Sequence, residues 1–266
     1  MRLPDPKPLR DAETDFVWVI VPFSRPENIE RVLSNFSRQK FPFKRLVVVE
    51  NGRALGASAP YRDRIALVLN TERHQSIAKN LALHEIRKRG GGFTVVMDDD
   101  DWYGPSFLTE ACGYAKTYDI VGKSRHFVSV DGGLWLCGRE KAHSKYPSIA
   151  GSTVACWAEA APEYPLVATG EEGDFCLKAL RQGMSLFGTD LYHYLYLRDS
   201  RADHTWGITA EDLRAHESAR GALDLGVIDY DIIKGERLDV PSVRLEARQD
   251  ADTLSPPPPG AAHVPA

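Results

Sequence analysis

Short apolar segments alternate with amphipathic segments along the first hundred residues, and this alternation limits the possible folds more than any other feature. Four segments have the length and the β-branched composition of buried strands: FVWVIV (16–21), RLVVVEN (45–51), RIALVLN (64–70) and FTVVM (93–97). Two segments between them have the apolar spacing of amphipathic helices: RPENIERVLSNFSRQ (25–39) and SIAKNLALHEIRKR (76–89). Strands and helices in short alternation predict an α/β fold, in which helices flank a mostly parallel sheet.

The second half of the chain has a less regular pattern. We expect helices at SFLTEACGYAKTY (106–118) and EEGDFCLKALRQG (171–183), the latter ending at Gly183. Strand-like patterns occupy 118–138, 152–157 and 184–198, and Asp131-Gly132-Gly133 predicts a hairpin turn. Residues 251–266 are rich in Pro and Ala and are predicted to form a disordered tail.

Composition and charge narrow the class of protein. No apolar run approaches the ~20 residues that span a bilayer, and the N-terminus lacks the apolar region of a signal peptide. The four cysteines are far apart and form no CxxC pair, so no disulfide framework is predicted. Together, these features predict a cytoplasmic protein. Residues 1–90 hold 17 Lys and Arg against 10 Asp and Glu. This excess of basic residues fits an anionic ligand such as a nucleoside diphosphate. The alternative is a chance excess on solvated faces.

Four consecutive aspartates, Asp98 to Asp101, follow the fourth predicted strand directly. In parallel sheets of α/β proteins, ligands bind outside the carboxyl ends of the strands. Carboxylate oxygens suit Mg²⁺ or Mn²⁺, and a bound cation would relieve the repulsion between the aspartates. The alternative is an exposed acidic turn, or a cap for the next helix.

Five segments, in this order, resemble the GT-A glycosyltransferases, in particular the family-2-like enzymes. VIVPFSRPENIERVLSNFSRQ resembles their first strand and helix, VVVENG their second strand, SIAKNLAL their ARNxG segment, VVMDDDDWYGP their DxD strand end and GEEGDFCLKALRQG their ED helix. The resemblance covers roughly residues 15–206. It implies the GT-A fold, a Rossmann-like, mostly parallel central sheet flanked by helices, with a small antiparallel portion on the acceptor side. A QxxRW segment is lacking, so the resemblance to processive polysaccharide synthases is poor.

The resemblance also implies a division of the chain. Residues 1–14 would be an N-terminal extension and residues 15–208 the GT-A domain, with a nucleotide-binding half at 15–104 and an acceptor and base half at 105–208. Residues 209–250 would form a C-terminal helical extension before the tail.

The resemblance assigns nucleotide-binding roles to residues at the ends of the predicted strands. Glu50, where the family usually has Asp, would sit at the base or ribose. Lys79 stands where the family usually has Arg and would approach the pyrophosphate, or it is a solvated helix lysine. The full set implied to bind the donor is Pro22, Phe23, Arg25, Glu50, Asn51, Lys79, Asp98 and Asp99.

Metal and catalytic roles follow from the same resemblance. Asp98 and Asp100 match the two ends of DxD, with Asp100 the preferred ligand of Mn²⁺ or Mg²⁺ and Asp101 close behind. His204 would complete the shell, or it is a structural histidine. Glu172 would be the catalytic base, with Glu171 and Asp174 as neighbours. The alternative is that these acids are present only because the dipole of a helix favours negative charge at its N-terminus.

The implied function is a metal-dependent glycosyltransferase that moves a sugar from a UDP- or GDP-sugar to an unknown acceptor hydroxyl, with inversion. Alternatives are a non-catalytic nucleotide-sugar-binding module and a nucleotidylyltransferase, although the Gly-rich loop of the latter is lacking after the first strand. Glycosylation of a hydroxylated DNA base is a further alternative. The net charge of -4 and the lack of a dense Lys/Arg stripe argue against tight binding to duplex nucleic acid.

Overall fold

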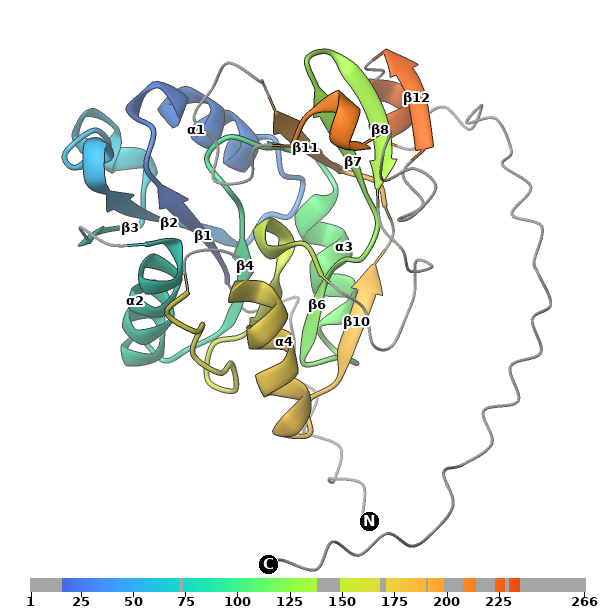
Figure 1. Ribbon diagram of the computed structural model, residues 1–266. Helices are drawn as coiled ribbons and strands as arrows, with labels where there is room; N and C mark the ends of the chain where they lie inside the picture. The colour runs from blue at the N-terminus through green and yellow to red at the C-terminus, as the bar shows by residue number, and fades with distance from the viewer. Residues whose placement is uncertain are drawn as a thin grey trace, which may run out of the picture.

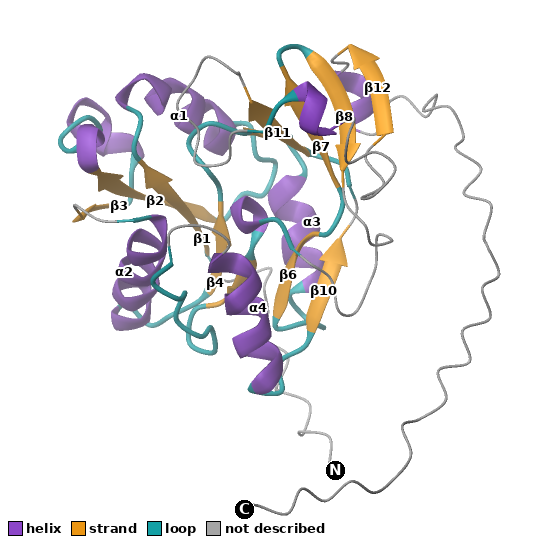
Figure 2. Ribbon diagram, viewed as in Figure 1, coloured by secondary structure: helices purple, strands orange, loops and turns teal. Residues whose placement is uncertain are grey.

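The computed structural model contains two β-sheets, with helices packed around the larger one (Figure 1). It describes residues 16–71, 74–137, 149–167, 171–189, 191–198, 208–213, 223–227 and 230–234. The larger sheet has the order β10-β6-β9-β4-β1-β2-β3, and the smaller has the order β12-β8-β7-β11-β5. Figure 2 shows the strands of both sheets and the helices beside them.

The larger sheet consists of β1 (Val17–Phe23), β2 (Lys44–Asn51), β3 (Leu67–Thr71), β4 (Phe93–Val96), β6 (Ile120–Lys123), β9 (Ala155–Trp157) and β10 (Leu186–Thr189). Strand β9 is antiparallel to both of its neighbours, and the other pairings in this sheet are parallel. All four strands predicted in the first hundred residues are therefore confirmed. Their carboxyl ends lie at one edge, which places the loop after β1 beside the aspartates that follow β4.

Two pairs of helices cover opposite faces of the larger sheet. Alternate side chains of β1 form one core with α1 (Ile29–Ser37) and α3 (Phe107–Tyr114). The intervening side chains form a second core with α2 (Gln75–Lys88) and α4 (Glu171–Arg181). Continuous apolar strands such as β1 are required because helices bury both faces. The predicted helix at 25–39 begins with a short 3-10 turn, Pro26–Asn28, and α3 ends before the predicted boundary at 118.

The smaller sheet consists of β5 (Trp102–Tyr103), β7 (His126–Val130), β8 (Gly133–Cys137), β11 (Tyr194–Arg198) and β12 (Leu223–Val227). Its pairings are antiparallel except between β7 and β11. The predicted hairpin is confirmed: β7 and β8 are joined at Asp131 and Gly132, which have φ values of 48° and 86°. Positive φ at both central residues is the geometry that Asp-Gly favours in a two-residue hairpin.

Two segments differ from the sequence-based expectation. The strand-like run at 184–198 is divided between β10 in the larger sheet and β11 in the smaller one, with a turn at His193 (φ 63°) between them. Side-chain alternation alone cannot say which sheet a strand joins. The segment predicted as a helical extension, 209–250, contains the helix α6 (Tyr230–Lys234) but also the strand β12, which pairs with β8. The division into domains stays a prediction.

The four cysteines are all free thiols. Among the described helices, none has both the length and the apolar character that a membrane crossing requires.

Candidate active site

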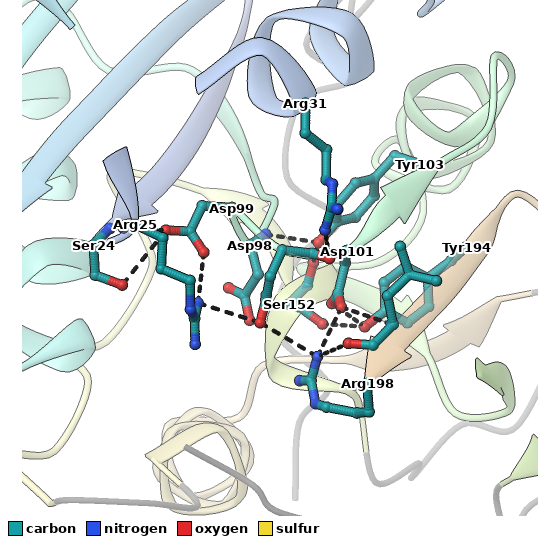
Figure 3. Close-up of polar contacts among 12 residues, drawn as sticks. Ser24, Arg25, Arg31, Asp98, Asp99, Asp101, Tyr103, Ser152, Tyr194 and Arg198 are labelled. Carbon is teal, nitrogen blue, oxygen red and sulfur yellow. Dashed lines mark hydrogen bonds and ion pairs between the residues drawn. The ribbon is translucent and has the colours of Figure 1, made fainter. Parts of the chain in front are cut away.

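The second aspartate of the run anchors the loop that follows β1. The Asp99 carboxylate accepts hydrogen bonds from the backbone N–H groups of Ser24 (2.8 Å) and Arg25 (3.0 Å). Its other oxygen lies 2.7 Å from Nη1 of Arg25 (Figure 3). Asp99 therefore shapes the loop that was predicted to surround the nucleotide, and its own contact with a nucleotide stays a prediction.

The fourth aspartate ties the end of β4 to the smaller sheet. Asp101 is fully buried and accepts hydrogen bonds from the Tyr194 hydroxyl (2.7 Å) and from the backbone N–H of Leu197 (3.1 Å). Nη1 of Arg198 lies 3.2 Å from the same carboxylate. These contacts leave Asp101 less accessible to a ligand than the sequence suggested.

The remaining two aspartates, Asp98 and Asp100, have other partners. One oxygen of Asp100 lies 3.2 Å from Nη1 of Arg25 and 3.4 Å from Nη1 of Arg198, so two arginines share it. The backbone N–H of Asp98 donates to the Tyr103 hydroxyl at 2.7 Å, which fixes its position. The Asp98 side chain has a buried oxygen, Oδ1, without a hydrogen-bond partner. An unpaired buried carboxylate oxygen is costly unless a ligand completes it.

These aspartates fit a divalent cation. One oxygen from each of Asp98, Asp100 and Asp101 lies within 4.8 Å of the others. Carboxylate oxygens are the donors that Mg²⁺ and Mn²⁺ prefer, and Asp98 Oδ1 is free to serve as one. His204, which was predicted to complete the metal shell, lies outside the described residues.

The electrostatics of the cluster point the same way. The pKa of Asp98 is raised to about 7: burial of the carboxyl group raises it most, Lys79 lowers it, and repulsion from Asp100 adds to the rise. Burial, followed by repulsion from Asp100, raises the pKa of Asp101 well above its ordinary value. A site that holds its carboxylates close together at this cost is suited to a cation of high charge.

The predicted nucleotide residues at the ends of β1 and β2 have mixed surroundings. Phe23 is fully buried in the apolar core, and Pro22 is buried within β1, so burial argues against nucleotide contact by either. The Glu50 carboxylate accepts hydrogen bonds from the backbone N–H groups of Gly56 (2.6 Å) and Ser58 (2.8 Å). Glu50 thus holds the loop after β2, while Asn51 at the strand end is only partly buried.

Lys79 forms a buried ion pair that the sequence did not suggest. Its Nζ lies 2.9 Å from Oε1 of Glu171, and Lys79 is 1% exposed, so the solvated alternative is wrong. Burial lowers the pKa of Lys79, but the carboxylates of Glu171 and then Asp98 outweigh it, and the net direction is upward. Lys79 therefore lies between the aspartate run and the start of α4. Its approach to a pyrophosphate stays a prediction.

The structure separates the three candidate bases on α4. Glu171 is engaged by Lys79, and Asp174 is exposed. Glu172 is partly buried, and burial, followed by repulsion from Glu171, raises its pKa. A Cβ at Gly151 would lie 3.1 Å from the Glu172 carboxyl group, so this glycine makes room for it. The pattern leaves Glu172 as the carboxylate best suited to accept a proton.

Replacing Lys79 with methionine is expected to lower the free energy of unfolding by about 3–5 kcal/mol, because Glu171 would remain as an unpaired buried charge. Urea denaturation measures the change. Lys88→Met is the matched control: Lys88 pairs with Glu85 on the surface and is 57% exposed, so a loss of at most about 1 kcal/mol is expected. A similar loss of unfolding free energy in both variants would show that the Lys79–Glu171 pair stabilises the protein no more than a surface pair does.

Sequence reasoning missed several residues of the site. Arg198 and Tyr194 arrive from β11, and Asn35 on α1 donates to the Asp101 carbonyl at 2.8 Å. The Tyr103 hydroxyl donates to the Ser152 carbonyl at 2.8 Å and holds the β4 end from the other side. Arg198 carries the clearest signal in the sequence, since it is a charged residue at the end of an apolar strand-like run.

The chain is matched over residues 17–153 by the model of glycosyl transferase family 2, and it belongs to this family. The match covers β1 to β4 and the aspartate run, together with the strands up to β8. It confirms the predicted family: four of the five segments lie within the match, and GEEGDFCLKALRQG (170–183) lies beyond it.

Two solved structures share the GT-A fold predicted for the chain. The first is the mannosyltransferase PcManGT from Pyrobaculum calidifontis in complex with GDP-Man and Mn²⁺, with a TM-score of 0.51 and 20% identity over 68% of this chain and 56% of that one. The second is S. aureus TarS 1–349, with a TM-score of 0.50 and 19% identity over 69% of this chain and 60% of that one. The chain thus spans less than two thirds of either. No curated protein matches the sequence.

Proposed function

We propose that the protein is a glycosyltransferase that transfers a sugar from a nucleotide-sugar donor to an acceptor hydroxyl. The observation that carries the proposal is that two sets of carboxylates with different surroundings lie near one edge of the sheet. Asp98, Asp100 and Asp101 form an oxygen cluster suited to a divalent cation, while Glu172, at the start of α4 and within electrostatic range of Lys79, has a raised pKa. The family match supports this assignment.

The residues of the chain have separate roles in the proposed reaction. A divalent cation, when held by Asp98, Asp100 and Asp101, would supply positive charge for the leaving diphosphate. Arg25, fixed by Asp99, adds positive charge beside the same loop. Glu172 takes the proton of the acceptor hydroxyl as its oxygen attacks the anomeric carbon. The bond from that carbon to the diphosphate oxygen breaks, and a single displacement of this kind inverts the anomeric centre.

UDP- and GDP-sugars are the proposed donors, and Mn²⁺ or Mg²⁺ the proposed cofactor. The solved structure of PcManGT contains GDP-Man and Mn²⁺, which supports including both in a test of this chain. The proposed location of the protein is the cytoplasm. The family match does not favour the nucleotidylyltransferase alternative, and a non-catalytic binding module is distinguished from an enzyme by turnover alone.

Thermal denaturation against a panel of nucleoside diphosphates and nucleotide sugars, with Mn²⁺, Mg²⁺ or EDTA, tests the proposal. One nucleoside diphosphate and its sugars are expected to stabilise the protein, by about 2.7 kcal/mol at a hundredfold excess over Kd. For a domain of this size that is a rise in Tm of roughly 5–10 °C. EDTA should remove the rise.

Turnover completes the test, because binding alone also fits a non-catalytic module. Slow release of the nucleoside diphosphate from the stabilising donor, with water as acceptor, is expected for an enzyme. A metal-dependent shift without any release over days would favour the binding module. No shift with any member of the panel would contradict the proposed function.

A further inference from the structure

Arg198, at the end of β11, is the residue whose contacts the proposed reaction leaves unexplained. Its Nη1 lies 3.2 Å from Oδ1 of Asp101 (Figure 3). The same nitrogen lies 3.4 Å from Oδ2 of Asp100. The same nitrogen donates to the Leu197 carbonyl. The side chain is 5% exposed, and its guanidinium carbon lies 3.1 Å from the centroid of the Tyr196 ring.

Arg198 uses carboxylates that the cation needs. Asp100 and Asp101 supply two of the three carboxylates that could hold a divalent ion. A guanidinium and a divalent cation on the same pair of carboxylates would repel each other at short range. Arg198 in its present place and a metal ion in the cluster would therefore compete for Asp100 and Asp101.

Of the two arginines on the cluster, Arg198 is the one that carboxylates hold less closely. Arg25 is held at 2.7 Å by Asp99, which also binds the Arg25 backbone N–H. Arg198 has longer contacts, of 3.2 and 3.4 Å, with the carboxylates. Its buried Nε has no hydrogen-bond partner, so part of its donor capacity is unused. The Tyr196 ring offers a face along which the planar head can shift while the stem stays packed.

We propose that Arg198 is an exchangeable counter-cation: it neutralises Asp100 and Asp101 in the donor-free protein, leaves them when they take a divalent cation, and then binds the diphosphate of the donor. The inference rests on the proposed function and extends it by a named residue. Its destination follows from chemistry, because a guanidinium matches phosphate oxygens in a two-pronged geometry. The diphosphate must lie beside the cation, within reach of a side chain displaced from the same carboxylates.

A structural ion pair is the alternative, since Arg198 joins the smaller sheet to the end of β4. The two roles predict opposite signs for metal binding. A purely structural arginine, when removed, would loosen the aspartates and weaken their affinity for a cation. An exchangeable one, when removed, would free the carboxylates and strengthen that affinity.

The experiment measures Mn²⁺ binding by electron paramagnetic resonance, without any nucleotide, in the wild type, Arg198→Met and the control Arg87→Met. The Arg87→Met variant also removes one positive charge. In the wild type, however, Arg87 donates to the carbonyls of Ala158 and Ala161 and not to the aspartates. We expect Arg198→Met to bind Mn²⁺ at least about tenfold more tightly, as removal of a charged hydrogen-bond competitor predicts. Arg87→Met should stay within twofold of the wild type.

The second arm measures binding of UDP and GDP by calorimetry at saturating Mn²⁺. Here the order reverses: Arg198→Met is expected to bind the preferred nucleoside diphosphate about tenfold or more weakly, because a charged contact to phosphate is lost. If Arg198→Met fails to fold, Arg198→Lys retains the charge and the stem. It should show a smaller gain for Mn²⁺ and still lose about fivefold or more for the nucleotide, since a lysine lacks the fork geometry.

The outcomes separate this inference from the proposed function. Unchanged or weaker Mn²⁺ binding in the Arg198 variants, while Asp100→Asn abolishes it, overturns the exchange and leaves the metal site standing. Equal Mn²⁺ binding in the wild type and Asp100→Asn shows that the metal site itself is wrong, and the exchange falls with it. Tighter Mn²⁺ binding with unchanged nucleotide binding overturns the diphosphate contact.

Discussion

Glu172→Gln is expected to reduce sugar transfer by about a hundredfold to ten-thousandfold while donor binding stays as in the wild type, because an amide cannot take the proton of the acceptor hydroxyl. The variant keeps the size and shape of the side chain beside Gly151. Release of the nucleoside diphosphate measures transfer, and the thermal shift with donor measures binding. Wild-type turnover in this variant would place the base elsewhere.

The neighbouring acids supply the controls for this experiment. Asp174 is exposed, so Asp174→Asn should change neither sugar transfer nor donor binding by more than about twofold. Glu171→Gln should lower stability instead, since it removes the buried partner of Lys79. The raised pKa of Glu172 adds a pH test. A base must be ionised, so the wild-type rate should fall as the pH drops through a pKa above the ordinary value of 4.5.

Asp100→Asn is expected to abolish metal-dependent donor binding. The amide keeps the shape of the side chain but removes the charge that Arg25 and Arg198 contact and that the proposed cation would use. Affinity for the donor in Mn²⁺ should fall by about a hundredfold or more, a loss of roughly 3 kcal/mol that is typical of a charged ligand. The thermal shift produced by donor and Mn²⁺ should shrink to the shift seen in EDTA.

Asp119→Asn is the matched control for the loss of one carboxylate. Asp119 accepts hydrogen bonds from the backbone N–H and the hydroxyl of Ser185, both at 2.9 Å, at the start of β10 and outside the aspartate cluster. It should lose some stability and keep the full response to Mn²⁺. If Asp100→Asn retains wild-type affinity and the same difference between Mn²⁺ and EDTA, Asp100 is not a metal ligand.

Much of the fold follows from local pattern in the sequence. The continuous apolar run of β1 needs helices on both faces, and the amphipathic segments that become α1 and α2 supply them. The Asp131-Gly132 turn is set by the preference of two residues for positive φ. The place of the aspartates at the carboxyl edge follows from parallel strands alone, and the structure confirms it for β4.

The roles of individual acids could not be inferred in this way. Four adjacent aspartates are identical in the sequence, yet Asp99 binds the loop after β1 and Asp101 binds Tyr194 and Leu197. The two glutamates that begin α4 differ only because Lys79 reaches one of them. Each distinction depends on a partner more than 70 residues away in the chain.

The sequence by itself determined the sheet, its helices and the edge at which a site must lie, because periodicity and turn chemistry act over a few residues. Only the tertiary structure decided that Asp101 is bound by Tyr194, that Asp98 has an oxygen without a hydrogen-bond partner, and that Asp100 is shared by two arginines. Arg198 illustrates the reason: it lies 97 residues beyond Asp101 and reaches it because β11 joins the second sheet beside β5. Pairings of that range depend on how two sheets pack, and no local pattern encodes them.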